Sequence, residues 1–583
     1  MSEFNIGLSI RNPQSPIRNP QLAPPPPPPR NLAPVLILGG GINGAAIARE
    51  LAVEGFGVCL VDTADLAYGA TAYSSRLIHG GLRYLEYGEF DLVRESLAER
   101  TRLLKLAPQY VRPLKLFVPV ERRFTGLGKT LARFLRMERA GGGTKTVPPR
   151  GLWLVRMGLR MYDMYARDPS LPTHATHAAT DPAAPRVDPQ RYRWLCSYYD
   201  AQVRYPERLV VALLDDARRA AAEHGSTFEV FTYHEATLAG QTATIRPRAG
   251  GEAVRSFEPA AIVNATGAWV DDTLQRLAVS SPKLMGGTKG SHLLSASPRL
   301  REALGGSAVY AEASDGRPVF VLPLGPDWTL IGTTDLRYEG DPGDAVCTVA
   351  ERDYLIDTVN RILPAARLAA ADIEWHYSGV RPLPHVGASS TAAVTRRHWL
   401  QEHAGAAVPL YSVIGGKLTT CRSLAESTVD TLAARLERPR QSSTRERPLP
   451  GAESYPAEDP TLAARQQRLA VATGCSAAQI AAMWALCGPR IEQIVIEFDD
   501  PSRENVPGTH LPTAFVRWVI EHEWATRLAD LVERRLMLLY EPQLSRHCLT
   551  RLAELLKCND VEGEVATVER RLRDHFGKQL VEG

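Results

Sequence analysis

The sequence lacks the pattern of a membrane-spanning protein. No uncharged apolar run reaches the roughly 18 to 20 residues that a transmembrane helix needs. The most apolar stretch, Val35 to Val61, is interrupted by Arg49, Glu50 and Glu54. Residues 1–30 contain no apolar segment typical of a signal peptide. We therefore expect no segment that crosses a bilayer.

Paired cysteines are also missing. The eight cysteines are scattered without a C-x-x-C pair, and no H-E-x-x-H sequence occurs. This spacing argues against a zinc or iron–sulfur site and against a disulfide framework. We predict no bound metal, and thiols that stay reduced in the cytoplasm.

An excess of charge of one sign is absent as well. The chain of 583 residues has 68 Lys and Arg against 65 Asp and Glu, a formal net charge of +3. The total charge therefore gives no support to nucleic-acid binding. With 44% hydrophobic residues, the chain is long enough for two or three globular domains.

The first part of the chain predicts a tail followed by a β-α-β unit. Residues 1–32 are rich in proline, with an unbroken tract from Pro24 to Pro29, and we expect them to be disordered. Val35–Leu38 predicts a buried strand, Ile42–Glu54 a helix, and Val58–Val61 a second strand.

Later segments predict a second type of sheet and a helical region. Val319–Leu322 and Thr329–Ile331 flank a Gly-Pro-Asp turn, which indicates an antiparallel hairpin. Two sheet types indicate two intertwined domains. Beyond the proline-rich and charged residues 438–460, His522–Tyr540 has apolar residues at helical spacing. This spacing predicts a helix that leaves four charged residues outside: Arg527, Asp530, Glu533 and Arg534.

A dinucleotide-binding fingerprint joins the first strand to the helix. Gly39, Gly41 and Gly44 give G-x-G-x-x-G, with Asn43 inside it, and Asp62 ends the second strand. The glycines allow a tight turn and a close approach of the backbone to a pyrophosphate at the helix N-terminus. The carboxylate can accept hydrogen bonds from ribose hydroxyls.

Two further segments favour FAD over NAD. Residues 69–81 offer hydroxyls, backbone N–H groups and glycines that could hold a second phosphate and let a flavin ring approach the backbone. The cofactor candidates there are Ser74, Ser75, Leu77, His79, Gly80 and Gly81. Residues 263–269 look like the strand end that closes over the dinucleotide in glutathione-reductase-like flavoproteins, with Thr266, Gly267 and Trp269 as candidates.

With these motifs the sequence resembles the FAD-dependent glycerol-3-phosphate dehydrogenases, within the D-amino-acid-oxidase-like flavoproteins. The motifs that carry the resemblance stand in the family's order: G-G-G-I-N-G at 39–44, S-S-R-L-I-H-G-G-L-R-Y-L-E at 74–86, K-G-S-H at 289–292, I-G-T-T-D at 331–335, S-G-V-R-P-L at 378–383 and G-G-K-L-T-T at 415–420. The resemblance runs from about Val35 into the C-terminal helices.

The resemblance implies roles at the substrate. Arg83, Arg381 and Arg396 match positions of the family's substrate pocket, and a phosphate monoester needs several such cationic donors. His292 is the candidate base for the substrate hydroxyl, with His79 as its rival.

Two further substrate-side residues and the remaining cofactor candidates also come from these motifs. Lys417 could place positive charge near the flavin or the substrate oxygen, and Tyr84 could donate a hydrogen bond to the substrate. The motifs imply further cofactor contacts at Asp335, Gly416, Lys417, Leu418 and Thr419.

A basic segment extends from Arg122 to Arg160. It has ten basic residues against one acid, with apolar residues interleaved, a composition that suits contact with anionic lipid headgroups. A solvated basic loop is the alternative. We expect a protein of the cytoplasm that binds peripherally to the inner face of the cell membrane, where a quinone accepts the electrons; a homodimer is left open.

The expected fold is α/β. A Rossmann-like FAD-binding domain (about 33–110, 195–285 and 370–437) is intertwined with an antiparallel-sheet substrate domain (about 111–194 and 286–369), followed by a linker at 438–460 and a helical C-terminal domain at 461–583. The implied activity is oxidation of sn-glycerol 3-phosphate to dihydroxyacetone phosphate. An oxidase that uses oxygen and a non-catalytic flavin-binding sensor remain as alternatives.

Overall fold

The computed structural model describes residues 33–123, 151–385, 397–455, 459–498 and 503–582. By its internal contacts the chain divides into two units, Met1–Leu32 and Ala33–Gly583. The expected proline-rich tail falls in the first unit and lies outside the described residues, as do residues 124–150 of the basic segment.

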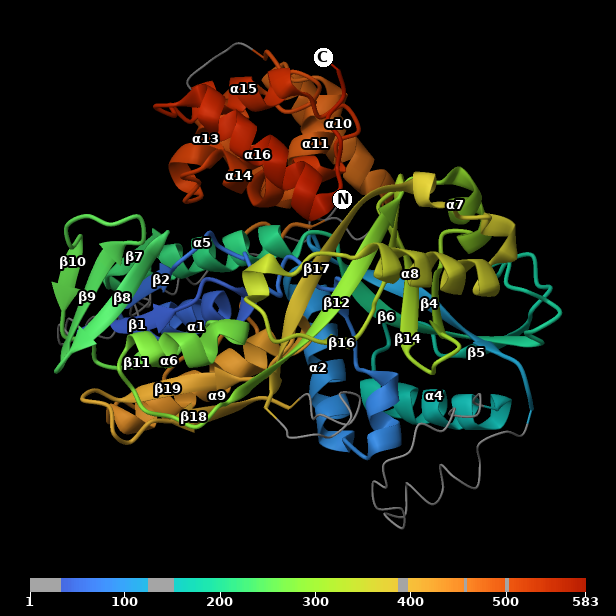
Figure 1. Cartoon of the computed structure of the whole chain (residues 1–583), viewed down its shortest axis with the longest axis horizontal. Coiled ribbons are helices and arrows are strands. Elements are labelled where there is room, and N and C mark those ends of the chain that lie inside the picture. Colours follow the sequence, from blue (N-terminus) through green and yellow to red (C-terminus); the bar gives the residue numbers. More distant parts are fainter. Residues whose placement is uncertain (1–32, 124–150, 386–396, 456–458, 499–502, 583) are drawn as a thin grey trace, which may run out of the picture. The chain divides into compact units, whose positions relative to one another are not determined.

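The first sheet of the second unit has six strands in the order β18-β19-β11-β1-β2-β7 (Figure 1). All neighbours are parallel except β18 and β19. The strands are β1 (Val35–Leu38), β2 (Val58–Asp62), β7 (Phe228–Thr232), β11 (Ile262–Asn264), β18 (Trp399–Glu402) and β19 (Leu410–Ile414).

This sheet is covered on both faces, which explains the unbroken apolar run of β1. Val35 and Ile37 point to a core formed with the helices α1 (Ile42–Val53), α5 (Pro206–His224) and α9 (Cys421–Arg435). Leu36 and Leu38 point the other way. That opposite face is covered by α6 (Val270–Arg276) and by a three-stranded sheet of β8 (His234–Ala239), β9 (Thr242–Pro247) and β10 (Arg255–Phe257).

The second sheet has ten strands, in the order β16-β12-β15-β14-β13-β4-β6-β3, with β17 paired to β12 and β5 to β6. It is antiparallel except where β13 meets β4. The strands are β3 (Leu77–Ile78), β4 (Val111–Val120), β5 (Ala175–Ala178), β6 (Trp194–Val203), β12 (Met285–Ser295), β13 (Ala308–Glu312), β14 (Pro318–Leu324), β15 (Trp328–Gly332), β16 (Leu336–Arg337) and β17 (Ile373–Pro384).

Helices cover both faces of this sheet too. On one face, α7 (Pro298–Leu304) and α8 (Val349–Ile362) pack on apolar residues of β12 to β15. On the other, α2 (Phe90–Leu106), α4 (Leu152–Ala166) and the C-terminal helices share one core with residues such as Leu294 and Trp375.

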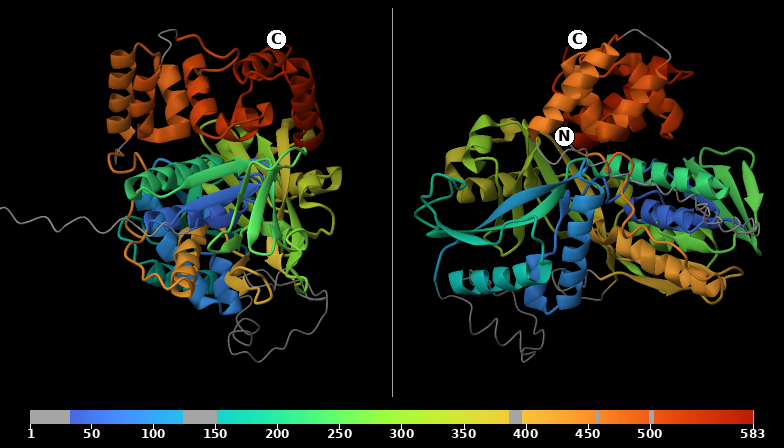
Figure 2. Two further views of the ribbon diagram at one scale, coloured as in Figure 1. Left: turned by 90° about the vertical axis from the view of Figure 1, so that its left-hand side faces the viewer. Right: turned by 180° about the vertical axis from the view of Figure 1, so that it is seen from behind.

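The last part of the chain is helical. Its helices are α10 (Asp459–Thr473), α11 (Ala477–Cys487), α12 (Ile491–Ile494), α13 (Thr513–His522), α14 (Leu528–Asp530), α15 (Arg546–Leu555) and α16 (Val561–Phe576). Two further views show these helices, in orange and red, against α5 and one end of β17 (Figure 2). No single helix in the described part of the chain has the length and apolarity to cross a membrane. One pair of helices, Pro460–Thr473 and Ala477–Glu497, has them when taken together, but the pair is bent by 117°.

The β-α-β unit and the hairpin confirm the sequence predictions. The predicted helix His522–Tyr540 is wrong. Helix α13 ends at His522, and positive φ angles at Trp524 (55°) and Met537 (55°) prevent a continuous helix over the residues that follow. Only short helical pieces lie between: α14, a π-helical turn at Leu531–Arg535 and a 3₁₀ turn at Leu538–Tyr540.

Three of the four charged residues expected outside that helix are buried. Asp530, Glu533 and Arg534 are at most 3% exposed, whereas Arg527 is exposed. The Arg534 and Arg535 guanidiniums both bind Asp65, which follows β2, at 2.5 and 2.7 Å. An ion pair between parts of the chain so far apart leaves no trace in local spacing, so helical periodicity misassigned these residues.

Candidate active site

A cavity of about 680 Å³ lies where the carboxyl ends of β1, β2 and β11 meet β12 and β17. It brings together most of the residues predicted from the motifs. Those that line it are Gly39, Gly41, Asn43, Asp62, Ser74, Ser75, Leu77, His79, Tyr84, Thr266, Gly267, Trp269, His292, Arg381, Gly416, Lys417, Leu418 and Thr419. Predicted site residues that are described but do not line it are Gly44, Gly80, Gly81, Arg83 and Asp335, and Arg396 lies outside the described residues.

The glycines of the fingerprint are required by close backbone packing. Gly39 has φ +104°, and a Cβ there would lie 2.7 Å from the Ala265 carbonyl oxygen. A Cβ on Gly44 would lie 1.9 Å from the Gly39 carbonyl oxygen. Gly44 therefore shapes the cavity by letting α1 approach β1, without lining it.

Asp62 stands at the end of β2, as the fingerprint requires. Its carboxylate accepts hydrogen bonds from the backbone N–H groups of Gly40 (2.6 Å) and Ala64 (2.8 Å). Burial nevertheless raises the pKa of Asp62 to about 6, because desolvation of the charge outweighs these two bonds. A ribose hydroxyl that donates to this carboxylate would help to restore its charge.

The loop of residues 69–81 forms one wall of the cavity. The Thr71 hydroxyl accepts the N–H of Ile42 at the start of α1 (3.0 Å), which ties this loop to the fingerprint. The His79 N–H donates to the Thr419 hydroxyl (3.1 Å). Gly80 instead donates its N–H to the Tyr162 hydroxyl (2.8 Å) behind the wall.

His292 projects from β12 and is 2% exposed. Its Nε2 lies 2.8 Å from the Ser75 hydroxyl, and its ring stacks on Tyr377 with centroids 4.9 Å apart. Gly332, paired with His292 across β12 and β15, leaves room for the imidazole, since a Cβ there would lie 2.3 Å from it. Burial, helped by the positive charges of Arg381 and Arg76, holds the pKa of His292 well below its usual value. The imidazole is therefore neutral at physiological pH and able to accept a proton.

Arg381 projects from β17 beside His292. Its guanidinium donates to the Thr333 hydroxyl (2.7 Å) and to the Asp335 carboxylate (3.1 Å). Gly290 makes room for it, because a Cβ there would lie 2.1 Å from the Arg381 Nη2. Asp335, predicted to contact the cofactor, thus contacts Arg381 and orients the cation at the cavity wall.

Lys417 and Tyr84 lie together on another side of the cavity. The Lys417 ammonium is 4.8 Å from the centroid of the Tyr84 ring, a cation–π contact between two residues that both line the cavity.

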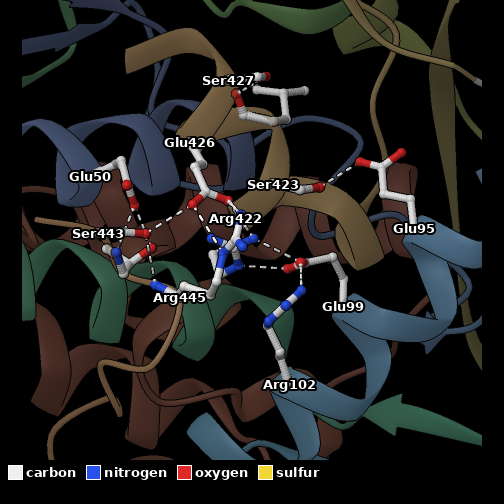
Figure 3. A network of polar contacts seen from close by, with 12 residues as sticks. Glu50, Glu95, Glu99, Arg102, Arg422, Ser423, Glu426, Ser427, Ser443 and Arg445 are labelled. Carbon is white, nitrogen blue, oxygen red and sulfur yellow. Dashed lines mark hydrogen bonds and ion pairs between the residues drawn. The ribbon is translucent and has the colours of Figure 1, made fainter. Parts of the chain in front are cut away.

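A polar network fixes the helix that follows Lys417, α9, on α2 (Figure 3). The Arg422 guanidinium donates to the Glu99 carboxylate at 2.7 and 2.8 Å, and Glu426 accepts from Arg445 at 3.0 Å. Burial alone would raise the pKa of Glu426, but these arginines outweigh it and lower the pKa to about 2. The turn at residues 416–420 is therefore held in place at the cavity.

Sequence reasoning missed Arg76 and Tyr73 as lining residues. Arg76 has φ 58°, is 2% exposed and forms an ion pair with Glu207 of α5 at 2.8 Å. Both residues lie in or beside the quoted motif at 74–86, but nothing local indicates their partners, which lie more than 100 positions away.

The lining residues fit an FAD molecule. Glycine backbone and the start of α1 stand at one end, with the Asp62 carboxylate beside them. The Asn43 Oδ1 in this wall is buried and has no hydrogen-bond partner within the described protein, which points to a donor on a bound group. In the residues with described positions, no cluster of three or more His, Cys, Asp or Glu could hold a metal ion.

Comparisons with known families agree with this geometry. The FAD dependent oxidoreductase family matches residues 34–422, and the C-terminal domain of alpha-glycerophosphate oxidase matches residues 442–559.

Individual relatives cover most of the chain. A glycerol-3-phosphate dehydrogenase of Synechocystis sp. is 36% identical over 72% of this chain and 74% of its own length. A D-erythritol 1-phosphate dehydrogenase of Brucella abortus (33%) and the aerobic glycerol-3-phosphate dehydrogenase of Escherichia coli (32%) each match 86% of this chain and 93% of their own length.

A solved structure shows the same fold. The glycerol-3-phosphate dehydrogenase of Bacillus halodurans, complexed with FAD, covers 92% of both chains with a TM-score of 0.67 at 23% identity.

Proposed function

This chain belongs to the FAD dependent oxidoreductase family, and from that premise we propose that it oxidises sn-glycerol 3-phosphate to dihydroxyacetone phosphate. The observation that carries the proposal is the shared cavity: a neutral, buried His292 and the cationic Arg381 line the same space as the dinucleotide fingerprint. When bound, FAD supplies the acceptor for the hydride that leaves C2 of the substrate.

The protein residues take the remaining tasks. His292 accepts the proton of the C2 hydroxyl on its unprotonated ring nitrogen, and Ser75 orients the ring. Arg381 binds the phosphate, held ready by Thr333 and Asp335. Lys417 and Tyr84 complete the substrate side. Arg83 and Arg396 stay predictions for the phosphate.

A second substrate, D-erythritol 1-phosphate, is favoured by one observation. The Brucella abortus relative with that activity in its name matches this chain over 93% of its own length. Both molecules present a phosphate monoester and a secondary hydroxyl, so both suit a site with one arginine and one neutral base.

An anaerobic titration of the purified holoenzyme tests the function. We expect sn-glycerol 3-phosphate to bleach the flavin absorbance and unphosphorylated glycerol to leave it unchanged, because glycerol lacks the group that Arg381 binds. Stronger bleaching by D-erythritol 1-phosphate would transfer the proposal to that substrate. No bleaching by any polyol phosphate would reject the dehydrogenase and leave the flavin-binding sensor.

We further propose that the electrons pass to a quinone in the inner face of the cell membrane. Support comes from α4, which begins inside the basic segment and continues past Arg160. One face of α4 is buried, and the other exposes Trp153 (47%), Met157 (50%) and Met164 (57%) beside Arg156 and Arg160. Exposed aromatic and apolar side chains flanked by arginines suit an anionic lipid surface.

The acceptor and the surface can be tested together. We expect reduction of a quinone analogue in anionic vesicles to exceed oxygen consumption by the same enzyme. Trp153→Ala should weaken binding to the vesicles, whereas Trp399→Ala, which removes a tryptophan 40% exposed on β18, should not. Faster reaction with oxygen would favour the oxidase, and equal vesicle binding by the two variants would remove α4 from the proposal.

A further inference from the structure

The loop Tyr73–Arg76 holds the proposed base in place. The Ser75 hydroxyl lies 2.8 Å from the His292 Nε2, and the Tyr377 hydroxyl donates to the Ser74 carbonyl oxygen at 2.7 Å. The Tyr377 ring also stacks under His292. The position of this loop therefore sets the orientation of the imidazole.

The end of the loop is fixed from α5. Arg76 donates to both carboxylate oxygens of Glu207, at 2.8 and 3.2 Å, and to the carbonyl oxygen of Arg204 at 2.7 Å. Because this pair is buried, it fixes the loop after Ser75.

The start of the loop is held by the C-terminal helix α16. The Arg571 Nη2 donates to the Tyr73 hydroxyl at 3.0 Å and to Glu533 at 3.0 Å, and the Arg571 Nε donates to Glu533 at 2.5 Å. The Tyr73 side chain lines the cavity and packs near Tyr377, with ring centroids 5.9 Å apart and the rings tilted by 35°.

Tyr73 also packs directly against strand β17. Strand β17 contacts Tyr73 at Gly379, where an added Cβ would lie 2.6 Å from the Tyr73 Cβ. Because this contact leaves no free space, a shift of Tyr73 would also displace β17, the strand that carries Tyr377.

We propose that Arg571 is a positioning residue for His292: through its hydrogen bond to Tyr73, the C-terminal helix α16 fixes the loop that orients the base. This inference rests on the proposed function only in taking His292 as the base. It assigns the C-terminal helices a part in the reaction, although none of their residues lines the cavity in the described chain.

Two variants test this contact: Tyr73→Phe removes it alone, and Arg571→Lys removes it together with the two-bond contact to Glu533. Tyr73→Phe keeps the ring and deletes the hydroxyl. Arg571→Lys keeps a cation beside Glu533, but a single ammonium replaces the fork that binds Tyr73 and Glu533 together. The matched control is Arg573→Ala, on the same helix, because Arg573 is 58% exposed and pairs with the exposed Asp574.

The test is stopped-flow reduction of the flavin in the holoenzyme by sn-glycerol 3-phosphate without oxygen. Each variant should lower the limiting rate about three- to tenfold, the equivalent of one hydrogen bond, while the substrate concentration at half-maximal rate changes less than about twofold. The double variant should be no slower than Arg571→Lys, because Tyr73→Phe then removes a bond that the lysine variant has already lost. Arg573→Ala should behave as the wild type.

Unchanged rates in Tyr73→Phe, or additive effects in the double variant, would overturn the inference. If Arg571→Lys fails to fold, Tyr73→Phe alone decides. A second measurement needs no substrate: the visible circular dichroism of bound FAD should change in Tyr73→Phe and not in Arg573→Ala. If the substrate does not reduce the flavin but the spectrum of Tyr73→Phe changes, the proposed function is rejected and the positioning role is kept. If the substrate does not reduce the flavin and the spectrum is unchanged, both are rejected.

Discussion

The two ends of the cavity are built from different materials. At the β1–α1 end the wall is mainly the glycine-rich backbone of one short stretch, residues 39–43, together with the Asp62 carboxylate. At the β12–β17 end the wall consists of side chains such as His292 and Arg381, which come from separate strands and are aligned by their neighbours. A backbone site tolerates almost no added atom, whereas a side-chain site can lose one group and keep its shape. The two ends should therefore fail in different ways.

The largest effect is expected at the backbone end. Gly44→Ala should yield protein that retains little or no FAD, because the new methyl group would lie 1.9 Å from the Gly39 carbonyl oxygen. Flavin content per purified chain measures this. The control is Gly405→Ala, where an added Cβ meets nothing within 4 Å. Normal flavin content in Gly44→Ala would show that α1 can move away from β1 at little cost.

At the side-chain end, removal of the base should leave the cofactor in place. His292→Ala should lower the rate of flavin reduction about 10²- to 10⁴-fold, the usual contribution of a positioned base, and keep the flavin bound. Stopped-flow reduction measures the rate directly. Reduction at the wild-type rate would shift the role to His79 or to a water molecule.

The pH dependence sharpens the same prediction. The pKa of His292 is lowered by burial and by two arginines, so the active, neutral form persists to acid pH. The ratio of wild-type to His292→Ala kcat/KM cancels the ionisation of the substrate. This ratio should be flat above pH 6.5, the ordinary histidine value, and should fall only below it. A rise through neutral pH would contradict the burial of the ring.

Arg381→Ala should have a smaller effect, seen mainly in substrate binding. Loss of a charge-assisted contact of about 1.5 to 3 kcal/mol corresponds to a rise in KM of about 10- to 150-fold, with the flavin spectrum unchanged. Arg299→Ala is the control, since Arg299 is 54% exposed and pairs with Asp372 on the surface. An unchanged KM would place the phosphate elsewhere.

The same contrast explains what the sequence could predict. The β1–α1–β2 unit was predicted to within one residue at each end, because strand, glycines, helix and acid follow one another in 28 positions, from Val35 to Asp62. The FAD fold followed from motifs at both ends of the cavity. The partners of Arg76, Tyr73 and Asp65 were not predictable, because each ion pair or hydrogen bond joins residues more than 100 positions apart.

The smallest expected effect returns to the cofactor end, where a side chain does contribute. Burial raises the pKa of Asp62 to about 6 in the protein without ligand. Ribose hydroxyls that donate to this carboxylate would stabilise its charged form and lower the pKa on binding. Below pH 6 the free site is protonated and must lose that proton to bind, so the affinity for FAD should fall severalfold from pH 7 to pH 5, at most about tenfold for each unit of pKa shift. Equilibrium binding of FAD to apoprotein across this range measures the effect. The Asp62→Asn variant should bind FAD more weakly at pH 7 and lose most of the pH dependence. If the unmutated protein binds FAD with the same affinity from pH 7 to pH 5, Asp62 does not change its protonation on binding.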